Sequence, residues 1–403
     1  MGKGLGTDMD RLEITTFRAD SYDQVSRNPQ VRYGDRLEDD LLRRDFTVNA
    51  MAVRITADGP GDFIDPLGGL TALRQRILDT PPTAPEVSFG DDPLRMLRAA
   101  RFVSQLRFDV SDRVRTAIVE MAPQLGRITV ERVAVELDKM LLGADPVAGI
   151  ELMVQTGMGD VVLPEIGGMQ MAIDEHHQHK DVYQHSLTVL RQAMELEDEG
   201  DRDLVLRWAA LLHDIGKPAT RRHESDGGGV SFHHHEVVGA KMVRKRMRAL
   251  KYSKQMIDDV SQLVYLHLRF HGYGDGKWTD SAVRRYVADA GPLLPRLHKL
   301  VRADCTTRNK RRAARLQANY DELETRIAEL AAKEDLQRVR PRSGRQRDHA
   351  VARHPARPAG GGQAWNFLKE LRLDRGPLDH DEAVAELLAW WNTRNGTDQP
   401  ASE

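Results

Sequence analysis

The sequence predicts an α+β protein that is mostly α-helical, with a short strand-bearing head and a long series of helices. Residues 12–15 (LEIT) alternate apolar and polar side chains, which is typical of a half-buried strand. Residues 46–53 (FTVNAMAV) have the composition of a second strand, and residues 56–69 read as a hairpin turn with a return strand. The proline-rich stretch 81–85 marks the point where strands give way to helices.

Composition sets broad limits on organisation and location. A chain of 403 residues is expected to hold about two to four domains. The net charge is −2, so RNA binding would depend on local basic stretches such as 241–254 and 308–315. Cys305 is the single cysteine, which excludes a disulfide framework and fits a reducing cytoplasm. No early segment suits a signal peptide or a membrane span. We therefore expect a cytoplasmic protein without a membrane partner.

Two arginines and an aspartate stand at the start of the second predicted strand. The guanidinium groups of Arg43 and Arg44 suit a triphosphate, because each can pair with phosphate oxygens bidentately. The alternative is a surface salt-bridge cluster with Asp45, since runs of charge usually lie on solvated faces.

A second arginine group lies on a predicted helix. Asp92 followed by Pro93 is a helix-start signal, with the acid as N-cap and the proline in the first turn. Arg95, Arg98 and Arg101 then recur at a spacing that places them along one helical stripe. This stripe is either a ligand-binding surface or an ordinary solvated face.

Several motifs occur in a fixed order along the chain: EITTFR, DL, RRDFTVNAMA, FIDPLGG and DDPLRMLRAARF. The series closely resembles the bacterial-type tRNA nucleotidyltransferases (CCA-adding enzymes) and their poly(A) polymerase relatives, within the DNA polymerase β-like superfamily. The resemblance runs from about residue 12 to about residue 336 and resumes near the C-terminus. It implies a polymerase β-like palm followed by a helical neck. It also implies addition of CCA to tRNA 3′ ends from CTP and ATP, with Mg²⁺ stabilising the entering and leaving oxygens.

The resemblance also implies roles for individual residues. The implied nucleotide-binding residues are Arg44, Asp45, Asn49, Asp92, Arg95, Arg98 and Arg101. Asp92 and Arg95 would present an acceptor and donors to the Watson–Crick edge of the incoming base. Cytosine and adenine each present an acceptor beside an amino donor, whereas uracil and guanine do not. Asp91 stands where the family usually has glutamate, which is a conservative change.

The catalytic metal ligands of the palm are not evident in the sequence. Asp8 and Asp10 form an Asp-x-Asp pair of the kind that can hold Mg²⁺. In the resembled family, however, such a pair follows a Gly-Gly-x-Val-Arg-Asp segment and precedes the strand by more residues than are present here. We therefore expect both aspartates in a turn, and a head truncated at its N-terminus. Glu13 is the remaining catalytic candidate, with a solvent-facing strand glutamate as the alternative.

A second group of candidate residues is rich in histidine. His185 lies near the start of a predicted helix, His213 and Asp214 end an apolar helix, and Asp304 follows much later. This order resembles that of HD domains, which are helical metal-dependent phosphohydrolases. The resemblance implies that these four residues bind a divalent transition metal. The additional histidines expected to line the site are His235 and His267. The alternative is a relic of the fold that binds no metal.

The predicted domains are a partial palm (1–80), a helical neck that binds nucleobase and RNA (81–170), an HD domain (171–320) and a helical tail (321–403). Within the tail, residues 340–362 lack any apolar period. They are either a disordered basic linker or, as we prefer, the product of two compensating frameshifts, because a one-base shift permits a sequence that the resembled enzymes carry. The leading functional hypothesis is tRNA nucleotidyl transfer. The alternatives are an HD-type phosphohydrolase and a catalytically dead RNA-binding protein.

Overall fold

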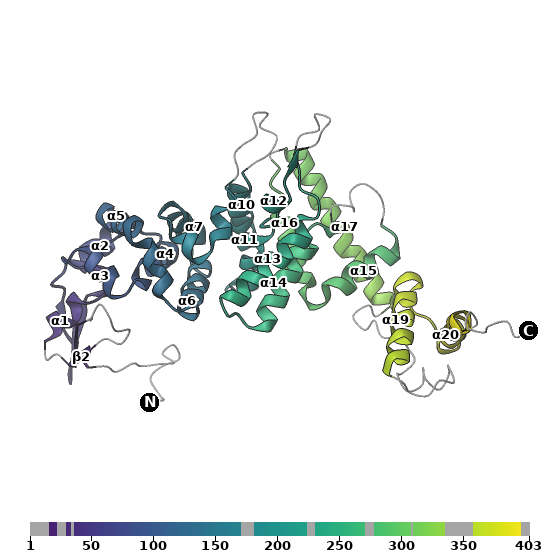
Figure 1. Ribbon diagram of the computed structural model, residues 1–403, viewed down its shortest axis with the longest axis horizontal. Helices are drawn as coiled ribbons and strands as arrows, with labels where there is room; N and C mark the ends of the chain where they lie inside the picture. The colour runs from purple at the N-terminus through teal and green to yellow at the C-terminus, as the bar shows by residue number, and fades with distance from the viewer. Residues whose placement is uncertain are drawn as a thin grey trace, which may run out of the picture.

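The protein is an elongated, mostly helical molecule in which a small strand-bearing head, a helical neck, a larger helical body and a helical tail follow one another (Figure 1). The computed structural model describes residues 16–21, 30–33, 36–170, 181–223, 230–270, 278–307, 309–334 and 358–395. The predicted α+β, mostly α fold class is confirmed. The predictions for Asp8, Asp10, Glu13 and the strand at 12–15 lie outside the described residues, as does most of the 340–362 segment.

In its described residues, the head contains two antiparallel strand pairs and the short helix α1 between them. Strand β1 (Arg18–Ser21) pairs with β2 (Gln30–Tyr33), and α1 (Leu37–Leu42) follows. Strand β3 (Ala52–Thr56) pairs with β4 (Gly59–Ile64), which confirms the predicted hairpin.

The prediction of one strand over residues 46–53 is wrong in its first half. The chain forms a short 3-10 helix, η1 (Thr47–Asn49), and β3 begins only at Ala52. Phe46 is fully buried, and the backbone N–H of Thr47 donates to the carbonyl of Asp79 at 2.9 Å. The strand-like composition of residues 46–50 therefore reflects burial of a tight turn rather than a strand.

A short connection leads from the hairpin to the neck. Helix α2 (Gly69–Gln75) is followed by β5 (Ile77–Leu78), which pairs in parallel with β6 (Asp109–Val110). Between these strands lie α3 (Pro85–Asp91) and α4 (Leu94–Leu106). The two helices meet at an abrupt corner, because Asp92 is extended and Pro93 starts the next turn.

The neck is built on α4. Its remaining helices are α5 (Asp112–Met121), η2 (Ala122–Arg127), α6 (Val130–Leu141), α7 (Pro146–Gln155), α8 (Met158–Val162) and α9 (Pro164–Gly167). Helices α6 and α7 both pack on α4. Gly149 lets α7 approach closely, since a Cβ atom there would lie 2.7 Å from the carbonyl oxygen of Ala100.

The body consists of helices that enclose a continuous apolar core. Its elements are α10 (Val182–Glu195), α11 (Leu204–Leu212), α12 (Lys217–Thr220), β7 (Arg222–His223), β8 (Val230–Ser231), α13 (His235–Ala249), α14 (Lys254–Leu266), α15 (Asp280–Ala290), η4 (Gly291–Leu293) and α16 (Leu294–Ala303). Helix α11 is nearly all apolar and lies at the centre, in contact with α10, α14 and α16.

Polar side chains join the neck to the body. Arg207 of α11 donates to the carbonyl oxygens of Leu141 and Gly143, at 2.6 and 2.9 Å. Trp208 Nε1 donates to Asp138 of α6 at 3.0 Å, and burial raises the pKa of that carboxyl group. These contacts fix α6 against the body.

The tail begins with the long helix α17 (Lys310–Glu334) and ends with α19 (Pro358–Arg375) and α20 (His380–Asn395). Arg284 of α15 anchors it, pairing with Glu334 at 2.7 Å. In the parts of the chain that are described, no helix combines the length and apolarity needed to cross a membrane.

Candidate functional site

Arg43 and Arg44 follow α1, and we call the segment that carries them the arginine loop. One buried carboxylate organises this loop. Asp40 is 3% exposed, and its two oxygens accept from Arg43 at 2.6 Å and from Arg44 at 2.7 Å. Burial alone would raise the pKa of Asp40, but hydrogen bonds from Arg44 and Arg43 outweigh it, so the pKa is lowered. The side chain of Arg44 remains 44% exposed. Asp40 thus holds two guanidinium groups side by side, with one accessible to an anion.

Two of the expected nucleotide-binding residues, Asn49 and Arg98, both contact a third, Asp45. Asp45 Oδ1 accepts from the backbone N–H of Phe46 at 2.9 Å and from Asn49 Nδ2 at 3.0 Å. Its Oδ2 accepts from Arg98 Nε at 2.7 Å. The network connects the arginine loop to α4, so Asp45 and Asn49 support the site. Arg98 lies at its edge, with one third of its side chain exposed.

Asp92 and Arg95 lie together at the corner between α3 and α4. Arg95 donates to Ser88 Oγ at 2.8 Å and to the carbonyl oxygen of Arg43 at 2.7 Å, which brings the arginine loop beside this corner. Asp92 accepts from Arg132 of α6 at 2.8 Å. Arg132 was not among the predicted site residues, since no local sequence signal relates it to Asp92.

Arg101 does not face the same surface as Arg95 and Arg98. It is 7% exposed, pairs with buried Glu136 of α6 at 3.2 Å, and packs its guanidinium 4.2 Å from the ring centroid of Phe102. The side chain is enclosed between two packed helices, and its predicted contact with the nucleotide stays a prediction.

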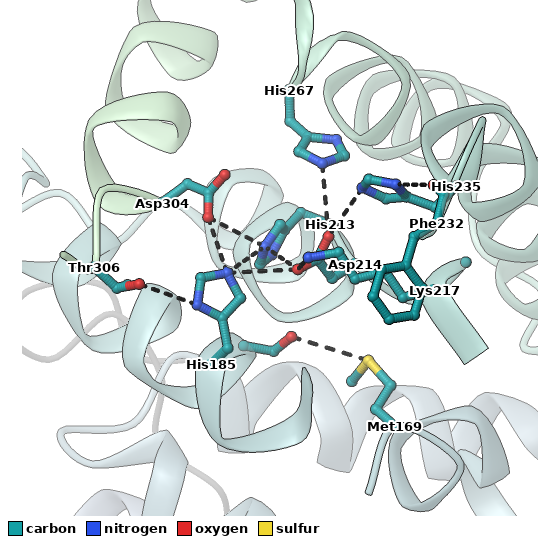
Figure 2. A network of polar contacts seen from close by, with 12 residues as sticks. Met169, His185, His213, Asp214, Lys217, Phe232, His235, His267, Asp304 and Thr306 are labelled. Atoms are coloured by element: carbon teal, nitrogen blue, oxygen red, sulfur yellow. Dashed lines mark hydrogen bonds and ion pairs between the residues drawn. The ribbon is translucent and has the colours of Figure 1, made fainter. Parts of the chain in front are cut away.

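The six residues of the HD pattern converge on one buried cluster in the body (Figure 2). They come from five places in the chain, at or next to α10, α11, α13, α14 and α16. His185 Nε2 lies 2.9 Å from Asp304 Oδ1 and 3.2 Å from His213 Nε2. Asp214 lies between the histidines, with its Oδ2 3.1 Å from His213 Nε2 and its Oδ1 3.2 Å from His235 Nε2.

Backbone carbonyl groups orient three of the imidazole rings. The Nδ1 atoms of His213, His235 and His267 lie 2.9, 2.8 and 2.6 Å from carbonyl oxygens of their own local turns. An Nδ1–H that donates to a carbonyl directs Nε2 inward, which is the usual arrangement of metal-binding histidines. The Nε2 atoms of His235 and His267 are buried and lie 3.2 and 3.7 Å from Asp214 Oδ1, without the geometry of a regular hydrogen bond to any described residue.

Positive charge stabilises the two buried carboxylates, Asp214 and Asp304. Burial would raise the pKa of Asp214 and of Asp304, but His213 holds both well below the usual range. Burial would lower the pKa of His213, yet the two carboxylates raise it to about 10. A divalent cation would neutralise the same carboxylates, and its binding would displace the proton from the His213 imidazole.

The ligand atoms form two groups that share Asp214. One comprises His185, His213 and Asp214, with Asp304 beside it, and the other comprises Asp214, His235 and His267; within each group of three the atoms lie within 4.8 Å of one another. Across the described residues, these are the groups of three or more His, Cys, Asp or Glu side chains that could hold a metal ion. The structure therefore brings together all six residues that the sequence singled out.

Three known families match successive parts of the chain. Residues 4–79 match the poly A polymerase head domain, and residues 107–169 match the probable RNA and SrmB-binding site of polymerase A. Residues 182–331 match the HD domain. Successive parts of the chain are therefore similar to domains of the poly(A) polymerase and tRNA nucleotidyltransferase family. Domains of these kinds are typically metal-dependent. The predicted boundaries at 80, 170 and 320 stay predictions.

Relatives in this family are similar over part of their length. The A-adding tRNA nucleotidyltransferase of Deinococcus radiodurans is 38% identical over 273 residues, which cover 66% of this chain and 60% of that protein. The CCA-adding enzyme of Geobacillus stearothermophilus is 36% identical over 210 residues, covering 52% of this chain and 46% of that enzyme. The chain thus spans about half of the length of these relatives.

The fold is shared with a solved member of the family. The Bacillus stearothermophilus CCA-adding enzyme in complex with CTP superposes with a TM-score of 0.61 at 23% identity. The match covers 95% of this chain and 80% of that structure. It shows that the head, neck, body and tail follow the architecture of that enzyme.

Proposed function

We propose that the protein is a tRNA nucleotidyltransferase that adds nucleotides of the CCA end to tRNA from CTP and ATP. The observation that carries the proposal is the contact between Arg95 and the carbonyl oxygen of Arg43, at 2.7 Å. It brings Asp92 and Arg95, which we propose read the base, beside the loop of Arg43 and Arg44, which would bind phosphates. The names of the relatives favour this function over the HD-type phosphohydrolase and over a catalytically dead RNA-binding protein.

Base selection follows from the chemistry of the two side chains. An ionised carboxylate only accepts hydrogen bonds and a guanidinium only donates them. Asp92 would accept from the exocyclic amino group of cytosine or adenine, and Arg95 would donate to the adjacent ring nitrogen. Uracil and guanine present the opposite pattern, so an acceptor would face Asp92 and a donor would face Arg95.

The triphosphate would bind at Arg44 and Arg98, which border the corner from the loop and from α4. Both are partly exposed and held by acids, Arg44 by Asp40 and Arg98 by Asp45. Charge-assisted contacts of this kind position an anion precisely. The arginines would thus orient the α-phosphate for attack by the terminal hydroxyl group of the tRNA.

Mg²⁺ is the metal that we propose for the transfer step, where it would stabilise charge on the phosphate oxygens. Asp40 and Asp45 do not fit as its ligands, because their carboxylate oxygens already accept hydrogen bonds: those of Asp40 from two arginines, and those of Asp45 from Arg98, Asn49 and the backbone N–H of Phe46. The tRNA would lie along the neck, where the chain matches an RNA-binding family. A tRNA substrate and a single unpaired cysteine fit a cytoplasmic protein.

We further propose that the HD cluster binds a divalent transition metal. His185, His213, Asp214 and Asp304 would hold it, with His235 and His267 on the other side of Asp214. The buried Nε2 atoms of His235 and His267, both turned toward Asp214, support a fit to a cation. Nitrogen and carboxylate donors suit metals such as Mn²⁺ or Ni²⁺.

Transfer and binding assays on the full chain test the proposed function. With Mg²⁺, tRNA lacking its 3′-terminal nucleotides and each labelled nucleotide in turn, any incorporation should be confined to C and A. CTP and ATP should also bind more tightly than UTP and GTP in the absence of tRNA. Failure of both incorporation and selective binding would overturn the proposal.

A further inference from the structure

Arg132 reaches from the neck to one of the two base-reading residues. It lies in the first turn of α6, and its Nη2 donates to Asp92 Oδ2 at 2.8 Å. The Asp92 side chain is 24% exposed and that of Arg132 is 51% exposed, so the pair lies at the surface of the corner between α3 and α4. The contact is the link between α6 and the residue proposed to read the base.

Both members of the base-reading pair are held by fixed partners. Asp92 Oδ1 accepts from the backbone N–H of Leu94 at 3.2 Å, while Oδ2 accepts from Arg132. Arg95 is held independently, by Ser88 and by the carbonyl oxygen of Arg43. A carboxylate has about four lone-pair sites, so Asp92 keeps acceptor capacity for a ligand while both oxygens are engaged.

The helix that carries Arg132 is itself held on two sides. Glu136 of α6 forms the buried pair with Arg101 of α4, and Asp138 accepts from Trp208 of the body. Lys251 of the body pairs with Glu131, the residue before Arg132. The start of α6 is therefore a rigid base from which the arginine reaches Asp92.

We propose that Arg132 is a positioning residue for base selection. It holds the Asp92 carboxylate in the orientation that accepts the amino group of cytosine or adenine, and it keeps that orientation when uracil or guanine offers an acceptor instead. This role rests on the proposed base-reading function of Asp92. Without Arg132, the Asp92 side chain is free to rotate away from an unsuitable base, and the penalty against that base falls.

Equilibrium binding of CTP, ATP and UTP to the full chain tests this role without requiring catalysis or tRNA. In Arg132→Ala, we expect the preference for CTP over UTP to fall by roughly twofold to fivefold, the range for a partly exposed charged contact. Arg132→Lys should restore part of the preference, since an ammonium group can pair with Asp92 but lacks the guanidinium fork.

Arg127→Ala is the matched control. Arg127 is an exposed arginine just before α6 that contacts Gln124 and not Asp92, so its loss removes the same charge without touching the corner. We expect its CTP-to-UTP preference to equal that of the wild type. A partly unfolded variant would lose affinity for all nucleotides equally, so the ratio separates positioning from folding.

The outcomes distinguish the two proposals. Wild-type selectivity that persists in Arg132→Ala would overturn the role of Arg132 and leave the proposed function standing. A wild-type chain that binds no nucleotide selectively would overturn the base-reading function and the role of Arg132 with it. Adding Arg132→Ala to Asp92→Ala should change selectivity no further, because the arginine acts through that carboxylate.

Discussion

Replacing Asp40 by asparagine should loosen the arginine loop while conserving side-chain size. The carboxylate is 3% exposed and accepts four N–H bonds, two from Arg43 and two from Arg44. In Asp40→Asn the charge is lost and the amide nitrogen faces one of the guanidinium groups. Breaking a fully buried ion pair costs about 3–5 kcal/mol. Because Arg43 and Arg44 are 29% and 44% exposed, solvent screening reduces the expected loss to about 1–2 kcal/mol.

The pH dependence of this effect has a definite sign. The pKa of Asp40 is lowered in the folded state, so its stabilising contribution is fully present above the ordinary value of 3.8. The contribution is lost as the pH falls through the folded-state value. The stability difference between wild type and Asp40→Asn should therefore be constant from pH 8 to pH 5 and should shrink below pH 3.8.

Hydrogen exchange of residues 36–64 and urea unfolding measure the loss. Asp39→Asn is the matched control, since it removes the same charge from an exposed position of the same helix. Equal protection of the arginine loop in wild type and Asp40→Asn at neutral pH would refute the stabilising role of Asp40. A stability difference between the two proteins that grows as the pH falls would refute it as well.

Two further predictions concern the body and the neck. Elemental analysis should find a divalent metal in purified wild-type protein and none in the His213→Ala/Asp214→Ala variant. Equal metal content in the two proteins would show that the cluster does not bind the metal. Arg101→Leu should cost about 3 kcal/mol of stability, because it leaves the buried Glu136 carboxylate unpaired, while the selectivity for CTP over UTP stays unchanged. Chemical denaturation and nucleotide binding on the same sample separate these effects, and a loss of selectivity would support the predicted contact of Arg101 with the nucleotide.

The sequence was informative where the order of residues resembles a known domain. The resemblance to HD domains predicted that His185, His213, Asp214 and Asp304 come together, and the structure places them in one cluster around Asp214. Periodicity was less informative about α4. It placed Arg95, Arg98 and Arg101 on one stripe, but only the packing of α6 shows that Arg101 is enclosed.

Contacts between distant segments lay beyond local reasoning. The pair formed by Asp92 and Arg132 depends on how α6 packs against the corner of α3 and α4, which no local pattern encodes. The turn at Phe46 had the composition of a strand, because buried turns and strands both require apolar residues. Tertiary hydrogen bonds, such as that from Thr47 to Asp79, decided its conformation.

Competition among the four nucleoside triphosphates in wild type and Arg95→Ala tests the central claim most directly. The wild type should prefer CTP and ATP, and Arg95→Ala should lose on the order of 1–3 kcal/mol of that preference, the value of a charge-assisted hydrogen bond to a base edge. Arg127→Ala should retain it. An unchanged preference for CTP and ATP in Arg95→Ala would contradict the account, because the base would then be read elsewhere.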